Sequence, residues 1–152
     1  MKLCSDVLKA LEGKTLVTAE SLTGGGIGAT LTAVPGASRV FKGGIISYTN
    51  EVKREVLGVP ASYLTQFGAV SAPVAKTMAQ GARNLLQADV ALSVTGLAGP
   101  DGDEFGHPVG TVFIGYADHN GVTAGEYHFT GDREAVRTQT IHAALQLILD
   151  SI

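Results

Sequence analysis

The chain has 152 residues, 45% of them hydrophobic, and a formal net charge of −3 at pH 7. This length predicts one domain, with enough apolar residues for a sizeable core. The 11 Lys and Arg residues are scattered and Trp is absent, which argues against nucleic acid as a partner. A single cysteine excludes an internal disulfide. We find neither a membrane-length apolar run nor a signal peptide, so we expect a cytoplasmic protein with no membrane partner.

Helices and strands are expected to alternate through the first half of the chain. Apolar residues recur at helical spacing near the N-terminus, short buried runs indicate strands, and glycines mark the ends of helices. In chain order we predict a helix over 5–12 ended by Gly13, a strand over 15–19, a small-residue helix over 25–34, a strand over 44–48, and a short helix from Asn50, its N-cap, to Leu57.

The second half is expected to add longer elements and a hairpin. We predict a helical turn over 61–67, a helix from Ser71, its cap, to about Gln87, a core strand over 89–95, a loop over 96–108, strands over 109–116 and 122–129, and a final helix capped by Asp132. This order predicts an α/β fold: a three-layer α/β/α sandwich with a mixed, mostly parallel sheet, and a C-terminal hairpin followed by a long helix.

The most informative segment is 18–26, where an apolar run ends at Ser21 and a glycine-rich turn leads into a helix. Backbone N–H groups at a helix start would stabilise an anion, either a phosphate or the oxyanion of an acyl transfer. Ser21 can therefore be a nucleophile, a phosphate ligand or a simple helix cap. The residues alone leave these three interpretations open.

A serine nucleophile needs a base, and histidine is the usual one. The histidines are His107, His119, His128 and His142. Only His107, in the glycine-rich loop, stays a candidate, and a histidine metal site is not expected.

Lysine is the other candidate base. Lys53 is predicted in the first turn of the helix that Asn50 caps, where the helix dipole would help to lower its pKa. Tyr48 ends the preceding strand and could relay or orient a proton. The competing interpretation is a solvated lysine on an exposed helix face.

Two further features concern anions. Arg133 and Arg137 are four residues apart on the last helix and share a face, so either could hold a phosphate or carboxylate; the alternative is a surface pair offset by neighbouring acids. The glycines over 24–28 loosely fit a dinucleotide-binding pattern. No acidic residue ends the next strand, however, so a dinucleotide cofactor site of the Rossmann type is not favoured.

Six sequence blocks occur in one order along nearly the whole chain: AESLTGG (19–25), GGIISYTNEVK (43–53), GAVS (68–71), TGLAGP (95–100), PVGTV (108–112) and GDR (131–133). In these blocks the chain resembles the CinA C-terminal domain family, whose active members are nicotinamide-nucleotide amidohydrolases. It is similar to the stand-alone, single-domain form. Residues 72–73 and 106–107 depart from the family pattern, which could change substrate fit.

The resemblance implies hydrolysis of the carboxamide of nicotinamide mononucleotide, without a metal or other cofactor, by a protein that is often a homodimer. Ser21 matches the nucleophile, Lys53 the base, Tyr48 the accompanying hydroxyl, and Arg133 or Arg137 a remaining polar residue. Further substrate contacts are expected from Thr23, Gly24, Gly25, Ser71, Thr95 and Gly96. The rival interpretation is a non-catalytic nucleotide-binding or regulatory module of the same family.

Overall fold

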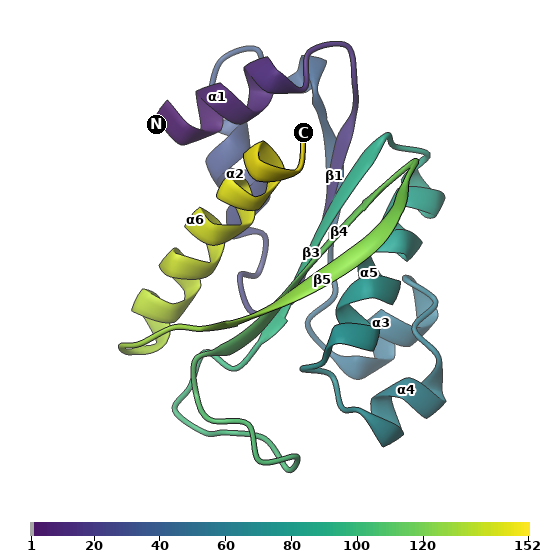
Figure 1. Cartoon of the computed structure of the whole chain (residues 1–152), viewed down its shortest axis with the longest axis vertical. Coiled ribbons are helices and arrows are strands. Elements are labelled where there is room, and N and C mark those ends of the chain that lie inside the picture. The colour runs from purple at the N-terminus through teal and green to yellow at the C-terminus, as the bar shows by residue number, and fades with distance from the viewer. Residues whose placement is uncertain (1) are drawn as a thin grey trace.

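The structure, a computed structural model, describes residues 2–152 and contains one five-stranded sheet with helices on both faces (Figure 1). The strands are β1 (Leu16–Glu20), β2 (Phe41–Ile46), β3 (Val90–Gly96), β4 (Thr111–Asp118) and β5 (Gly121–His128). The helices are α1 (Lys2–Ala10), α2 (Gly26–Thr32), the 3₁₀ turn η1 (Ala37–Arg39), α3 (Asn50–Glu55), α4 (Ala61–Gln66), α5 (Ala72–Leu86) and α6 (Arg133–Ser151).

The sheet is mixed, in the order β2-β1-β3-β4-β5. Strands β2, β1 and β3 pair in parallel, β4 is antiparallel to β3, and β5 is antiparallel to β4. Two reversals return β5 to the direction of β3, so only β4 runs against the others. The mixed, mostly parallel sheet and its C-terminal hairpin are therefore confirmed.

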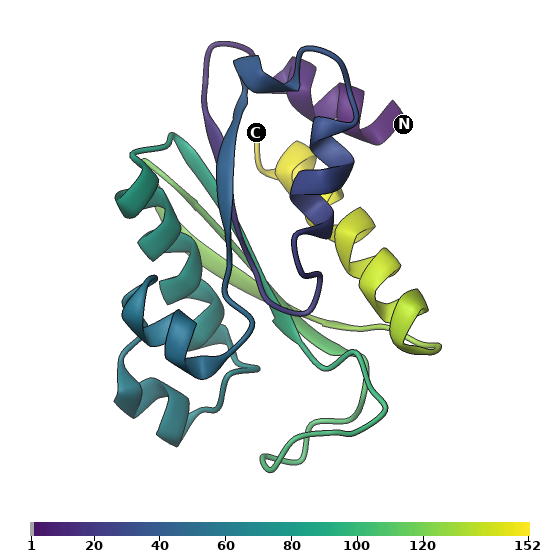
Figure 2. The same cartoon turned by 180° about the vertical axis from the view of Figure 1, so that it is seen from behind.

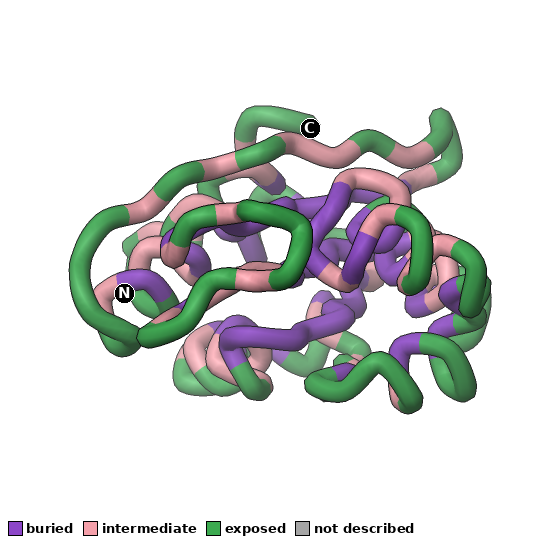
Figure 3. The backbone as a smooth tube through the Cα atoms, turned by 90° about the horizontal axis from the view of Figure 1, so that it is seen from below, coloured by how far each residue is buried: buried purple, intermediate pink, exposed green. Residues whose placement is uncertain are grey.

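Three helices cover each face of the sheet, which confirms the three-layer α/β/α sandwich. Helices α1, α2 and α6 lie on one side and α3, α4 and α5 on the other (Figures 1 and 2). Alternating side chains of β1 serve both cores: Leu16 packs on the α6 side, and Val17 and Ala19 on the α5 side. Strands β1, β3 and β4 are almost wholly buried, whereas β2 and β5 alternate between half-buried and exposed residues. Figure 3 shows the buried residues in purple, mainly inside the molecule, and the exposed ones in green. None of the helices in residues 2–152 is long and apolar enough to cross a membrane.

One close backbone approach joins α5 to the segment after α3. A Cβ atom placed on Gly81 would overlap the carbonyl oxygen of Leu57. Glycine is therefore required at this position because no side chain fits between the two backbones.

Several element boundaries differ from the sequence prediction. Helix α1 begins at Lys2 rather than residue 5, and β2 begins at Phe41 rather than 44 because its pairing with β1 already starts at Leu16. Strand β4 begins at Thr111, not at residue 109. Each difference lies at an end, where local patterning is weakest.

Of the three predicted N-caps, one is confirmed, one is wrong, and one residue holds the N-cap position without a capping hydrogen bond. Asp132 caps α6 as predicted, by accepting a bond from the Ala135 amide. The prediction that Asn50 caps α3 is wrong, because Thr49 holds that position and its hydroxyl accepts from the amide of Val52. Ser71 stands at the N-cap position of α5, but its hydroxyl donates to the carbonyl of Gly68 instead of capping the helix.

Candidate active site

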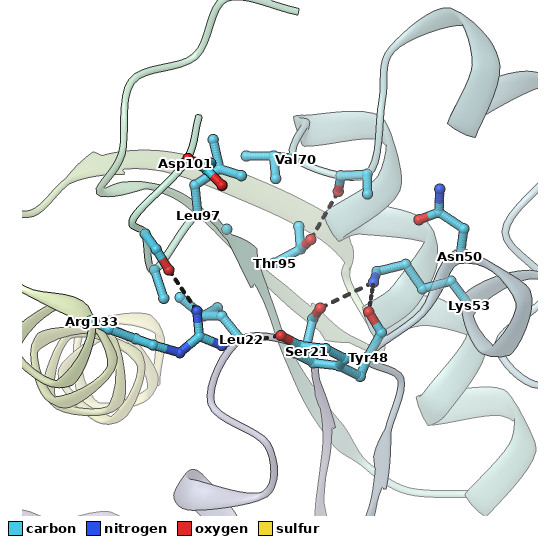
Figure 4. Close-up of a pocket in the computed structure, with 14 residues that line it drawn as sticks. Ser21, Leu22, Tyr48, Asn50, Lys53, Val70, Thr95, Leu97, Asp101 and Arg133 are labelled. Atoms are coloured by element: carbon cyan, nitrogen blue, oxygen red, sulfur yellow. Dashed lines mark hydrogen bonds between the residues drawn. The ribbon is translucent and has the colours of Figure 1, made fainter. Parts of the chain in front are cut away.

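A cavity of about 300 Å³ opens where the carboxyl ends of β1, β2 and β3 meet the loop after β3 (Figure 4). This volume suits a small organic ligand. The lining residues are Ser21, Leu22, Tyr48, Asn50, Lys53, Ala69, Val70, Thr95, Gly96, Leu97, Ala98, Gly99, Asp101 and Arg133. Parallel strands place their carboxyl ends at one edge, so residues distant in sequence gather here.

Ser21 and Lys53 are in direct contact in this cavity. Lys53 Nζ lies 3.0 Å from Ser21 Oγ, and the same nitrogen donates to the carbonyl oxygens of Ser47 at 2.9 Å and Tyr48 at 3.2 Å. Ser21 directly follows β1, and Lys53 extends from α3 (Figure 4). This distance places the hydroxyl of Ser21 and the amine of Lys53 within proton-transfer reach of each other.

Burial changes the acidity of Lys53. Its side chain is only 1% exposed, and this loss of hydration lowers its pKa from 10.5 to about 8. The sequence predicts a contribution to this lowering from the dipole of the helix start. Lys53 lies in the last turn of the six-residue helix α3, and burial is the cause of its lowered pKa. The alternative of a solvated surface lysine is wrong, because the side chain is buried.

Tyr48 and Arg133 meet at the mouth of the cavity. The Arg133 guanidinium donates to the hydroxyl of Tyr48 at 3.1 Å and to the carbonyl oxygen of Gly99 at 2.6 Å. Tyr48 is 57% exposed, and in residues 2–152 its hydroxyl bonds neither Lys53 nor Ser21. Tyr48 therefore supports the lysine through its backbone carbonyl, while its hydroxyl faces the arginine.

Arg137 has a different position from Arg133. Its guanidinium donates to the carbonyl oxygens of Leu22 and Thr23, at 3.0 and 3.1 Å, from outside the cavity. Of the two arginines that the sequence left as alternatives, Arg133 lines the cavity and Arg137 supports the turn after Ser21.

A side chain of the protein itself occupies the helix start after Ser21, where the sequence predicts a site for a bound anion. The Glu20 carboxylate accepts bonds from the backbone amides of Ile27 and Gly28 at the start of α2. Gly24 and Gly26 donate their amides to carbonyl oxygens within the turn. The expected anion site at this helix start is therefore already occupied. The only signal in the sequence was an acidic residue at the end of a buried strand.

The other residues predicted to contact substrate divide into two groups. Thr95 and Gly96 line the cavity, and the Thr95 hydroxyl donates to the carbonyl of Ala69 at 2.9 Å. The lining does not include Thr23, Gly24, Gly25 or Ser71. Asn50 and Asp101 also line it, although neither was predicted as a substrate contact, because their contribution depends on how distant segments pack together.

His107 does not join the serine. Its Nδ1 lies 2.7 Å from a carboxylate oxygen of Asp103 in the same loop, and its ring packs edge-on against Phe113. Among residues 2–152, no three His, Cys, Asp or Glu side chains gather as they would to hold a metal ion.

Comparison with known proteins places this site in a family context. The model of the CinA C-terminal domain matches residues 2–152. A CinA-like protein of Geobacter metallireducens is 52% identical over 133 residues, which cover 88% of this chain and 32% of the relative. A CinA-like protein of a Synechococcus species is 61% identical over 114 residues, covering 74% of this chain and 27% of the relative. The chain thus spans about a third of the length of these relatives.

Solved structures agree over almost the whole chain. The competence damage-inducible protein A of Klebsiella pneumoniae superposes with a TM-score of 0.95 at 36% identity, covering 97% of this chain and 92% of that protein. A competence-damaged protein superfamily member of Escherichia coli gives 0.96 at 34% identity, covering 99% and 88%.

Proposed function

Because this chain belongs to the CinA C-terminal domain family, we propose that it hydrolyses the carboxamide of nicotinamide mononucleotide to nicotinic acid mononucleotide and ammonia. Ser21 is the nucleophile and Lys53 the base. The single observation that carries the proposal is the 3.0 Å separation between Ser21 Oγ and Lys53 Nζ in a buried position. A serine is inert without such a base.

The surroundings of Lys53 suit a neutral amine. A neutral amine has two N–H groups and one lone pair. Two carbonyl oxygens, of Ser47 and Tyr48, take the two N–H groups and leave the lone pair for the hydroxyl of Ser21. After accepting the serine proton, the ammonium donates to the same three oxygens. The proton can thus move without any rearrangement of the site.

The reaction has two stages. Ser21 Oγ attacks the carboxamide carbon as its proton passes to Lys53. The ammonium returns a proton to the amide nitrogen, the carbon–nitrogen bond breaks, and ammonia leaves an ester on Ser21. Lys53 then takes a proton from water, the hydroxide attacks the ester carbon, and Ser21 recovers its proton as nicotinic acid mononucleotide departs.

Backbone amides next to Ser21 stabilise the tetrahedral oxyanion in this mechanism. The amides of Gly24 and Gly26 are occupied within the turn. In the described part of the chain, no backbone carbonyl accepts a hydrogen bond from the amide of Leu22, and Leu22 lines the cavity. We therefore assign the oxyanion to the Leu22 amide instead of the whole glycine turn.

Arg133 holds the phosphate of the nucleotide at the cavity mouth. Two of its nitrogens already bond Gly99 and Tyr48. A guanidinium has five N–H donors, so several are left for an anion, and a bidentate contact to phosphate is its preferred geometry. The start of α2 offers no such place because Glu20 fills it.

The test is ammonia release from nicotinamide mononucleotide by the wild type, Ser21→Ala and Lys53→Met. Each substitution should lower kcat by about 10²–10⁴-fold. Ser62→Ala is the matched control, since Ser62 is exposed on α4 and does not line the cavity. Full turnover by Ser21→Ala would refute the nucleophile. Calorimetric binding of the nucleotide without ammonia release would favour the non-catalytic module.

A further inference from the structure

The Glu20 carboxylate is 2% exposed and accepts four hydrogen bonds. Oxygen Oε1 accepts from the Thr23 hydroxyl at 2.6 Å and the Ile27 amide at 2.8 Å. Oxygen Oε2 accepts from the Thr18 hydroxyl at 3.1 Å and the Gly28 amide at 3.0 Å. All four partners act as donors, which suits an ionised carboxylate because it only accepts.

These donors lie on both sides of the nucleophile along the chain. Thr18 belongs to β1, Thr23 to the turn after Ser21, and the two amides to the first turn of α2. One side chain therefore joins the strand end, the turn and the helix start around Ser21. Removing it would free the turn on which Ser21 stands.

The backbone of Glu20 is also hydrogen-bonded to Ser47, the residue whose carbonyl oxygen holds Lys53. The carbonyl oxygen of Glu20 accepts from the Ser47 amide at 2.8 Å. The carbonyl of Ser47 in turn accepts from Lys53 Nζ at 2.9 Å. Glu20 thus lies between the segment that carries the nucleophile and the segment that holds the lysine.

The pairing explains why a carboxylate is needed here rather than an amide. Each oxygen accepts one hydroxyl and one backbone N–H. A glutamine could orient its NH₂ toward either pair, and a threonine hydroxyl could rotate to accept from it. The backbone N–H of Ile27 or Gly28 cannot rotate away. In either orientation the glutamine NH₂ therefore faces a backbone N–H, and two buried donors are left without an acceptor between them.

From these contacts we infer that Glu20 is a positioning residue, whose carboxylate fixes the turn so that Ser21 Oγ stays within reach of Lys53 Nζ. The inference rests on the proposed function for its kinetic consequence. It also assigns the start of α2 to an internal carboxylate, so that this helix start serves the geometry of the nucleophile and does not bind the phosphate of the substrate.

The experiment compares wild type, Glu20→Gln and a control in ammonia release and in crystal structures. Displacing a reacting group by about 1 Å costs on the order of 10²-fold in rate. We expect Glu20→Gln to lower kcat about 100-fold with KM within about threefold, in protein that circular dichroism shows to be fully folded. Its crystal structure should show Ser21 Oγ displaced from Lys53 Nζ.

Asp89→Asn is the matched control. The Asp89 carboxylate also accepts a backbone amide and a hydroxyl, both from Thr15, but it lies beside the start of β3, at the opposite end of the sheet from the cavity. Its kcat should equal that of wild type. If Glu20→Gln fails to fold, Thr23→Val removes one of the four bonds and should lower kcat by a smaller factor with the same unchanged KM.

The outcomes separate the two proposals. A folded Glu20→Gln protein with wild-type kcat, or with the Ser21–Lys53 contact intact in its crystal structure, overturns the positioning role. If the wild type itself releases no ammonia, the proposed function fails. The crystal structures then decide the role of Glu20 by themselves: displacement of Ser21 supports it, and an unchanged contact overturns it.

Discussion

The pH dependence of ammonia release should report the titration of Lys53. The base must be neutral, and its buried amine has a pKa of about 8. At pH 7, one unit below this value, roughly a tenth of the lysine is neutral, and above pH 9 nearly all of it is. We therefore expect kcat/KM to rise about tenfold between pH 7 and 10, with its midpoint near 8.

The assay is initial-rate ammonia release at low concentrations of nicotinamide mononucleotide. Such rates give kcat/KM, which reports groups of the free enzyme. The series starts at pH 7 because a phosphate monoester itself titrates near 6. Circular dichroism at each pH identifies any loss of folded protein.

Two variants test the assignment to Lys53. Lys53→Met has no base, and Lys53→Arg carries a charge that a protein cannot remove. Both should lack the rising limb. A flat profile in wild type, or a midpoint near the ordinary lysine value of 10.5, would refute the argument that burial prepares this lysine as the base.

Three further predictions concern stability and binding. The free energy of unfolding of wild type, relative to that of Lys53→Met, should increase by about 1 kcal/mol per pH unit between pH 8 and 10.5. The reason is that the pKa of Lys53 is lower in the folded state than in the unfolded chain, so the unfolded chain binds more protons in this window. Denaturant titrations check this, and a difference that does not depend on pH would contradict it. Arg133→Met should raise KM about tenfold or more with a smaller effect on kcat, since it removes the proposed charge-assisted contact with the phosphate. Steady-state kinetics test this, and an unaltered KM would contradict it. Gly81→Ala should destabilise the fold by about 1–3 kcal/mol, because its Cβ would overlap the Leu57 carbonyl. Thermal melts measure this, and an unchanged Tm would show that α5 can shift away from Leu57 without loss of stability.

The local patterns in the sequence were sufficient to predict the layers of the fold. Short apolar runs, glycine stops and an Asp-capped last helix indicated the strands and helices now seen, with errors mainly at their ends. The reason is that periodicity and turn chemistry act over a few residues, so one chain displays them without any tertiary information. The exchange of Asn50 for Thr49 as a cap shows where this reasoning stops, since both residues suit the position.

The sequence by itself determined which residues were candidates for a site: a serine at a strand-to-helix turn, a tyrosine at the end of the next strand and a lysine after it. Only the tertiary structure decided the partners. It buried Lys53 against Ser21, placed Arg133 at the cavity and Arg137 behind the turn, and filled the helix start with Glu20. These outcomes depend on contacts between segments far apart in the chain and on exclusion of water, which no local pattern encodes.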